Sequence, residues 1–475
     1  MLFSSTTFLF YFLPIVLILY YATFWSREVQ NTILLVMSLL FYAWGEPRYI
    51  VLMMASILFN YCFGLLIDWG KNATAKKTLL VLSIIGNIGT LFVFKYLNFF
   101  VRNLNQSIGA SHAITVPNII LPIGISFFTF QAMSYVIDVY RGTAKVQKNV
   151  GDLGLYISFF PQLVAGPIVR YSAIQEQILK RKESLTKFSA GSSRFIVGLS
   201  KKILVSNSMA IVVDRIFTLQ AENGAIPVTL AWLGAIAYTL QIYYDFSGYS
   251  DMAIGLGLMF GFRFDENFNY PYISKSIGEF WRRWHISLGT WFKEYVYFPL
   301  GGSRVENKDK MVRNLFIVWL LTGIWHGAEW TFVFWGAFNF FFILLEKLLS
   351  WESIKIKPWI KHMYCMFVVI IGWVLFRSEN LIQAGSYLKD MFRLGEAGFF
   401  SSYTFMFIRE YFVFFAAAIV FSMPLARRTN RYISEQKQGF VVFEVLYPVV
   451  MMGLFFICVC YLVKGTYNPF IYFNF

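Results

Sequence analysis

Two of the four histidines in this 475-residue chain lie in strongly aromatic sequence. His285 ends the run Phe-Trp-Arg-Arg-Trp-His, and His326 stands in Gly-Ile-Trp-His-Gly between two apolar runs. An ionisable ring is costly at membrane depth unless it is paired or lines a wet cavity, so such a residue suggests a functional site. Histidine is also the usual general base near neutral pH. The sequence therefore predicts that His326 removes a proton from an acceptor hydroxyl.

Each histidine also has a structural interpretation. His326 could instead join neighbouring helices by hydrogen bonds, and Gly327 after it would let another group approach the backbone closely. His285 lies in a stretch with the profile of an amphipathic helix, where a histidine often only fills an interface. His112 in a polar loop and His362 at a helix end are expected to be ordinary residues.

The composition places this chemistry in a membrane. The chain is 57% hydrophobic and only 14% charged, with a mean hydropathy of +0.57, whereas a soluble domain is about 25% charged. The apolar runs are also longer and more continuous than the strands of about 10 residues in a membrane β-barrel. The chain is therefore expected to be an all-α, multi-pass integral membrane protein.

The formal net charge of +15 does not require a nucleic-acid partner. No basic soluble module is visible that would hold one, and the positive-inside rule and contact with anionic lipid in the bilayer account for the charge. The four cysteines lie in apolar runs, and the side chains of Cys458 and Cys460 would point about 200° apart on a helix. A shared metal ion is therefore not expected.

Some apolar segments are too short for the roughly 20 residues of a spanning helix. Segments 152–169, 246–261 and 314–325 are expected to be re-entrant or broken helices shielded by protein or water. About eleven true spans remain by this criterion. The apolar segments are 7–25, 31–45, 49–68, 78–100, 117–139, 152–169, 189–214, 227–245, 246–261, 314–325, 330–346, 362–377, 411–426 and 440–464.

Lysine and arginine in the connecting segments predict the orientation. Cytoplasmic loops are enriched in these residues. If the basic loops are cytoplasmic, the N-terminus lies outside. The segment 377–410 is an exception, because it is basic although this topology places it outside. The predicted cytoplasmic loops are 69–77, 141–150, 170–188, 347–361 and 427–437.

Two further stretches combine polar and apolar residues. The segment 262–313 mixes aromatic with basic residues, which predicts helices at the cytoplasmic interface within a single domain spanning 1–475. Gln241, Asp245 and Asp251 fall at an expected break between two apolar segments. They would line a polar tunnel or support the active site, or else join helices by hydrogen bonds.

Several motifs together resemble the membrane-bound O-acyltransferase family, in its bacterial branch of alginate and peptidoglycan O-acetyltransferase membrane subunits. They are Tyr-Pro-Tyr-Ile-Ser-Lys-Ser-Ile-Gly-Glu-Phe-Trp-Arg-Arg-Trp-His at 270–285, Trp-His-Gly at 325–327, Leu-Pro-Ile-Gly-Ile-Ser-Phe-Phe-Thr-Phe-Gln at 121–131 and Phe-Phe-Pro-Gln-Leu-Val-Ala-Gly-Pro at 159–167. The resemblance covers nearly the whole chain, and the motifs are specific in combination.

The resemblance implies a helical bundle around a central tunnel and assigns roles to the candidate residues. His326 matches the family's base, and His285 matches its second position, which is asparagine in many eukaryotic members. The resemblance also implies acetyl-CoA, or another thioester, as a donor substrate on the cytoplasmic side, with no bound cofactor. Trp325, Gln241, Asp245 and Asp251 become candidates for the tunnel or its support, and Arg282, Arg283 and Lys293 for binding the donor phosphates. Positive-inside charge alone would also place basic residues there.

The implied function is O-acetylation of an extracytoplasmic polysaccharide, such as alginate or peptidoglycan. The acetyl group would pass to a separate extracytoplasmic partner of the SGNH-esterase type, and the protein would lie in a bacterial cytoplasmic membrane. The alternative is a transporter or flippase for a polysaccharide precursor or lipid, because broken helices and intramembrane polar residues suit that class too. An inactive scaffold is a third possibility, which the presence of both histidines argues against.

Overall fold

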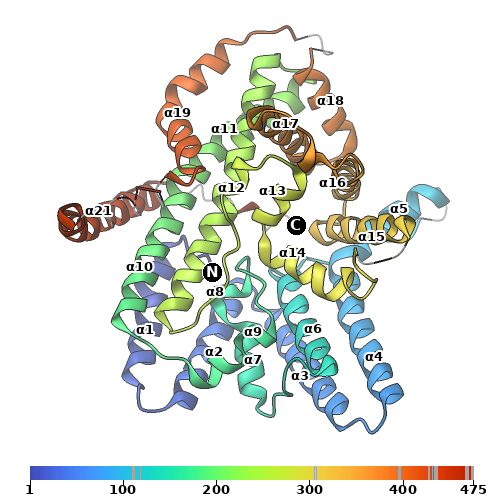
Figure 1. Ribbon diagram of the computed structural model, residues 1–475, viewed down its shortest axis with the longest axis vertical. Helices are drawn as coiled ribbons and strands as arrows, with labels where there is room; N and C mark the ends of the chain where they lie inside the picture. Colours follow the sequence, from blue (N-terminus) through green and yellow to red (C-terminus); the bar gives the residue numbers. More distant parts are fainter. Residues whose placement is uncertain are drawn as a thin grey trace. The chain divides into compact units, whose positions relative to one another are not determined.

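A computed structural model describes most of the chain (Figure 1). The described residues are 1–109, 113–117, 119–303, 305, 307–393, 397–425, 428–429, 432, 437–465 and 470–471, so the expectation for His112 lies outside them. Every regular element in these residues is a helix. The prediction of an all-α protein is confirmed.

The chain divides into two compact units. The first comprises Met1–Ser192 and Ala253–Asp265, and the second comprises Ser193–Met252 and Glu266–Phe475. Two of the three boundaries fall inside long helices, α10 (Leu185–Ser200) and α12 (Val228–Met259), and the third follows Asp265.

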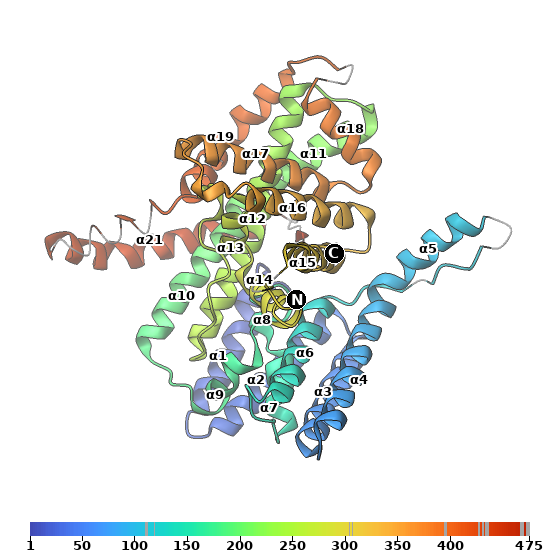
Figure 2. The same cartoon turned by 45° about the vertical axis from the view of Figure 1, so that its right-hand side comes forward.

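In the first unit, α3, α4 and α6 pack on one another, and they lie side by side in both ribbon views (Figure 1, Figure 2). Helices α6 and α7 are almost entirely buried. The elements wholly in this unit are η1 (Phe8–Phe12), α1 (Leu13–Ala22), α2 (Arg27–Gly45), α3 (Ile50–Trp69), α4 (Ala73–Leu91), η2 (Phe92–Tyr96), α5 (Leu97–Ile108), α6 (Ile125–Arg141), α7 (Val150–Ser158), α8 (Phe160–Leu163) and α9 (Tyr171–Lys180).

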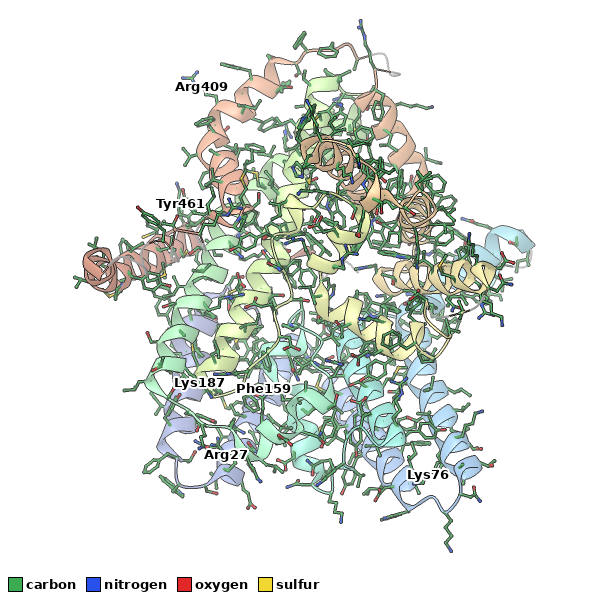
Figure 3. All side chains as sticks on the ribbon, in the orientation of Figure 1. Arg27, Lys76, Phe159, Lys187, Arg409 and Tyr461 are labelled. Atoms are coloured by element: carbon green, nitrogen blue, oxygen red, sulfur yellow. The ribbon has the colours of Figure 1, made fainter. Side chains whose placement is uncertain are left out.

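The predicted break in segment 152–169 is present. Helix α7 ends before Phe159, which is labelled in Figure 3, and the four-residue α8 follows with Pro161 in its first turn. The backbone N–H of Phe160 donates to Ser38 Oγ at 3.1 Å. The break is therefore buried in protein, and the backbone donor at its start has a partner there, as irregular backbone at membrane depth requires.

The second unit holds both histidines of interest. Its elements are η4 (Lys201–Ser206), α11 (Asn207–Asn223), η5 (Pro271–Ile273), α13 (Ile277–Arg283), α14 (Ile286–Phe292), η6 (Lys293–Tyr297), α15 (Lys308–His326), α16 (Trp330–Leu348), η7 (Trp351–Ser353), α17 (Pro358–Arg377), α18 (Leu381–Met391), α19 (Ser402–Phe421) and α21 (Lys437–Lys464).

The break expected between segments 227–245 and 246–261 is wrong, because α12 runs through both as one 32-residue helix. Its carboxylates pair with two lysines of the helical segment η4: Asp245 with Lys202 and Asp251 with Lys201. These partners stabilise the charges without unwinding the backbone. Segment 314–325 is likewise part of a continuous 19-residue helix, α15, rather than a broken one.

Seven helices in the described residues are long and apolar enough to cross a membrane, which makes the protein multi-pass. The estimate of about eleven spans and the orientation stay predictions. The seven stretches are Ile50–Trp69, Ala73–Ile108, Leu185–Asn223, Trp330–Leu348, Pro358–Arg377, Ser402–Phe421 and Val445–Lys464.

Helices α15 and α16 approach closely through two glycines. A Cβ atom at Gly336 would lie 2.5 Å from the carbonyl oxygen of Trp319 and 3.2 Å from Gly323 Cα. Small residues permit such contact between membrane helices. The two helices lie side by side in both ribbon views (Figure 1, Figure 2). This contact fixes the end of α15, where His326 lies.

Gly336→Val should disturb both stability and activity, because the added methyl groups must push α16 away from α15. Overpacking of this kind costs about 1–3 kcal/mol. We expect a lower melting temperature in detergent and a lower rate of acyl transfer. Gly453→Val is the matched control, because a side chain at Gly453 on α21 would enter open space. Equal melting temperatures for the two variants would contradict the role given to the glycine contact.

Candidate active site

His326 is the last residue of α15 and is almost fully buried, with 4% of its surface exposed. Three aromatic rings surround it edge-to-face: Trp325, Trp335 and Phe376 have ring centroids 5.0, 5.0 and 5.1 Å away. The Phe332 ring occupies the space where Gly327 would carry a side chain. The close approach suggested for Gly327 is therefore made by Phe332, and it fixes the turn after His326.

His285 lies between two short helices, α13 and α14, and its φ of +44° is in the left-handed region. Only 2% of its surface is exposed. The ring of Phe246 on α12 packs against its imidazole edge-to-face, at 4.5 Å between centroids. The expectation of a histidine on an amphipathic helix is therefore wrong in its local detail, since His285 occupies a buried turn. A non-glycine residue in this conformation is uncommon and points to a functional constraint.

Trp325 connects the two histidines. Its ring is 5.0 Å from that of His326 and 6.1 Å from that of His285. Burial, and to a lesser extent the nearby His326, hold the pKa of His285 well below its usual value of 6.5. The His285 ring is therefore neutral at physiological pH, which is the form that can accept a proton or a hydrogen bond.

Helix α16 fixes the helix that leads into His285. The Glu346 carboxylate accepts hydrogen bonds from the backbone N–H groups of Ile277 and Gly278, at 2.5 and 2.9 Å. The indole of Trp281 donates to Asn339 at 2.9 Å. Carboxylates are favourable at a helix N-terminus, where N–H groups lack partners in the helix. The start and the middle of α13 are therefore both attached to α16.

Sequence reasoning missed Asn267. This residue is fully buried, and its side-chain oxygen lies 3.2 Å from His285 Nδ1 and 2.9 Å from the Ser287 hydroxyl. Its amide nitrogen donates to Ser250 on α12 at 3.0 Å. In the sequence Asn267 lies between Glu266 and Phe268, 18 residues before His285, and only the fold brings the two side chains together, so no local signal would have found it.

The polar cluster of α12 does not converge on the histidines as a group. Asp245 forms an ion pair with Lys202 at 2.5 Å and accepts from the backbone N–H of Ile471 at 2.9 Å. Asp251 pairs with Arg194 and Lys201, both at 2.6 Å. The Gln241 side-chain oxygen is buried without a hydrogen-bond partner in the described residues. Ser250 is the member of this stretch that reaches His285, through Asn267.

The three basic candidates lie at or near the surface of the second unit. Arg282 and Glu352 form an exposed ion pair at 3.0 Å, while Arg283 pairs with Glu279 at 2.9 Å within α13. The Lys293 ammonium lies 5.5 Å from the centre of the Phe298 ring. Exposed pairs contribute little to stability, so Arg282 can change partners at small cost, whereas Arg283 is half-buried and also donates to the Asn269 backbone oxygen at 3.0 Å.

Comparisons with known proteins identify the family of the chain. The family model for the membrane-bound O-acyltransferase (MBOAT) family matches residues 152–377, which include both histidines. A probable alginate O-acetylase, AlgI, of Pseudomonas syringae pv. tomato is 45% identical over 403 residues, which cover 83% of this chain and 76% of that protein.

Two relatives carry other names. The peptidoglycan O-acetyltransferase of Helicobacter pylori is 36% identical over 428 residues, covering 82% of this chain and 80% of that protein. The teichoic acid D-alanyltransferase of Bacillus subtilis is 30% identical over 233 residues, covering 47% of this chain and 58% of that protein.

A multi-pass helical membrane protein with a buried two-histidine site is the class that fold and site define. The chain belongs to the membrane-bound O-acyltransferase family, in the branch of the alginate and peptidoglycan enzymes. It is a membrane O-acyltransferase, as the resemblance of its motifs implies.

Proposed function

We propose that this protein transfers an acetyl group from cytoplasmic acetyl-CoA toward an extracytoplasmic polysaccharide, with His326 as the general base. One observation carries the proposal: His326 and His285 both pack against Trp325 in a buried aromatic site. Burial strengthens electrostatic interactions with the reacting groups and excludes competing water. The family to which the chain belongs supplies the reaction class, acyl transfer to oxygen.

The reaction needs one base and two positioned substrates. His326 takes the proton of the acceptor hydroxyl as its oxygen attacks the thioester carbonyl carbon. The carbon–sulfur bond then breaks, and the departing coenzyme A thiolate takes a proton, which restores the neutral histidine. Proton transfer of this kind contributes about 10²–10⁴-fold to the rate, and holding donor and acceptor together supplies much of the rest.

The names of two relatives suggest which acceptor this protein serves. Relatives named for alginate and peptidoglycan O-acetylation support a polysaccharide as the final acceptor. We place the protein in a bacterial cytoplasmic membrane, with the base reached by donor and acceptor from opposite sides. The immediate acceptor is then a serine hydroxyl on an extracytoplasmic SGNH-type partner, which passes the acetyl group to the sugar.

Purified protein in nanodiscs with radiolabelled acetyl-CoA tests the donor and the partner. We expect release of free coenzyme A that increases when a candidate SGNH-type partner is added. A D-alanyl thioester serves as the competing donor, because one relative is named a D-alanyltransferase. Release from the D-alanyl donor alone would contradict acetyl-CoA as the donor. Substrate movement across vesicles without thioester cleavage would favour the flippase alternative.

Arg282→Ala with Arg283→Ala should raise the KM for acetyl-CoA several-fold, if these side chains hold the donor phosphates. The turnover number at saturating donor should change little, because neither side chain is proposed to touch the reacting carbon. The matched control is Arg141→Ala with Lys145→Ala, which removes one charge from the end of α6 and one from the loop that follows it. An unchanged KM in the first double variant would assign its charge to lipid contact instead.

A further inference from the structure

Asn267 has a hydrogen-bond arrangement that determines the orientation of its amide group. The backbone N–H of Ser287 lies 3.1 Å from Asn267 Oδ1. A backbone N–H only donates, so the atom it meets must be the amide oxygen. The Nδ2 group points instead to the Ser250 hydroxyl, 3.0 Å away. The orientation of the amide is therefore set by its neighbours.

The same oxygen sets the tautomer of His285. Its Nδ1 atom lies 3.2 Å from Asn267 Oδ1. Because that oxygen only accepts, Nδ1 must carry the proton for the contact to be a hydrogen bond. In a neutral imidazole the other nitrogen, Nε2, then carries a lone pair. The structure thus gives His285 an acceptor at Nε2 rather than a donor.

Asn267 is itself held on both sides. Its backbone oxygen accepts from the Ile286 N–H at 3.0 Å, directly after His285. The preceding residue, Glu266, forms two hydrogen bonds with Arg194, at 3.0 and 2.5 Å. Arg194 also binds Asp251 on α12 through Nε, at 2.7 Å. Asp251 therefore acts on this site at a distance, by fixing the segment that carries Asn267.

Burial lowers the pKa of His285, and the charges near it do not offset this effect. His326 on α15 is the titratable group that acts on it electrostatically. The two carboxylates of α12 are compensated by their cations, Asp245 by Lys202 and Asp251 by Arg194 and Lys201. On α13, Glu279 is compensated by Arg283 and the Arg282 pair is exposed. Glu266, beside Asn267, is bound by Arg194.

We propose that Asn267 is a positioning residue that holds His285 as its Nδ1–H tautomer, so that Nε2 accepts a hydrogen bond in the acyl-transfer site. The assignment of that site to acyl transfer with acetyl-CoA rests on the function proposed above. Metal-bound histidines are held by hydrogen-bond partners of this kind, and removal of such a partner typically lowers activity about 10- to 100-fold. We expect a loss of about the same size when Asn267 no longer fixes the tautomer of His285.

Nitrogen NMR of protein labelled with ¹⁵N-histidine tests the tautomer without any substrate. The signals of His285 are assigned by their loss in His285→Gln. We expect a protonated Nδ1 and an unprotonated Nε2 in the wild type, and loss of this preference in Asn267→Leu, which keeps the branched shape of the side chain but has no polar atom. A protonated Nε2 in the wild type, or an unchanged tautomer in Asn267→Leu, would overturn the proposal.

Activity against pH separates positioning from mere structural support. Asn267→Asp keeps the oxygen acceptor but adds a negative charge, which favours the imidazolium form of His285. The low-pH limb of kcat should therefore move up by about 1–3 pH units, and activity should recover at high pH. Asn267→Leu should lose kcat at every pH with an unchanged donor KM. Asn269→Asp adds the same charge on an exposed neighbour and should leave the profile in place.

Equal losses in Asn267→Asp and Asn267→Leu, with the pH profile unmoved, would show a purely structural role and contradict the proposal. Failure of the function proposed above gives a different result. In that case the wild type releases no coenzyme A from acetyl-CoA at any pH, while the NMR measurement still decides the tautomer of His285.

Discussion

His326→Gln should abolish most acyl transfer, lowering the turnover number by about 10²–10⁴-fold while the protein still inserts and folds. Glutamine fills a similar volume and keeps hydrogen-bonding groups, but it does not take a proton at neutral pH. The aromatic rings around His326 should continue to pack against the substituted side chain. The measurement is the rate of coenzyme A release at saturating acetyl-CoA, alongside elution profile and melting temperature.

His362→Gln is the control for this prediction. His362 lies on α17, and its Nδ1 binds the backbone oxygen of Ser274 at 3.0 Å. The substitution removes the same chemical group from a position outside the proposed site, so activity should stay near that of the wild type. Wild-type turnover in His326→Gln would remove the base assignment, and an equal loss in both variants would point to a general effect of replacing histidine.

Lys202→Met should destabilise the second unit strongly. The Lys202 and Asp245 side chains are 2% and 1% exposed and lie 2.5 Å apart. Removing one partner of a buried pair leaves an uncompensated charge, which costs about 3–5 kcal/mol. We expect a large fall in melting temperature and in the yield of monodisperse protein, measured in the same detergent.

The double variant Lys202→Met with Asp245→Asn should recover most of that loss. The asparagine is neutral and keeps an oxygen for the Ile471 N–H, which donates to Asp245 at 2.9 Å in the wild type. Arg282→Met is the surface control, because its exposed ion pair should contribute no more than about 1 kcal/mol. No recovery in the double variant would show that the effect of Lys202 comes from packing and not from charge.

The sequence predicted those features that depend on local chemistry. His326, between Trp325 and Gly327, indicated a site because an ionisable ring in an apolar run is costly unless it is paired or lines a wet cavity. The short length of the apolar segment 152–169 indicated a broken helix, which α7 and α8 confirm. The all-α membrane class followed from composition, because long apolar runs with little charge suit spanning helices.

Features that depend on distant partners were not predictable in this way. Asp245 and Asp251 lie at the break that the sequence predicted, but their cations lie 43 to 57 residues earlier in the sequence. Asn267 is 18 residues from His285 and meets it only because the chain turns sharply there. A single sequence shows the types of these residues but not the turn at His285, whose φ is positive.

In the function proposed above, His326 drives acetyl transfer across the membrane from a cytoplasmic thioester. The most direct measurement uses sealed proteoliposomes of known orientation, with radiolabelled acetyl-CoA on the predicted cytoplasmic side and an SGNH-type partner on the other. Wild-type protein should label the partner across the bilayer, and His326→Gln should not, although both incorporate equally. Equal labelling by the two proteins, or labelling only when donor and partner share one side, would contradict the account.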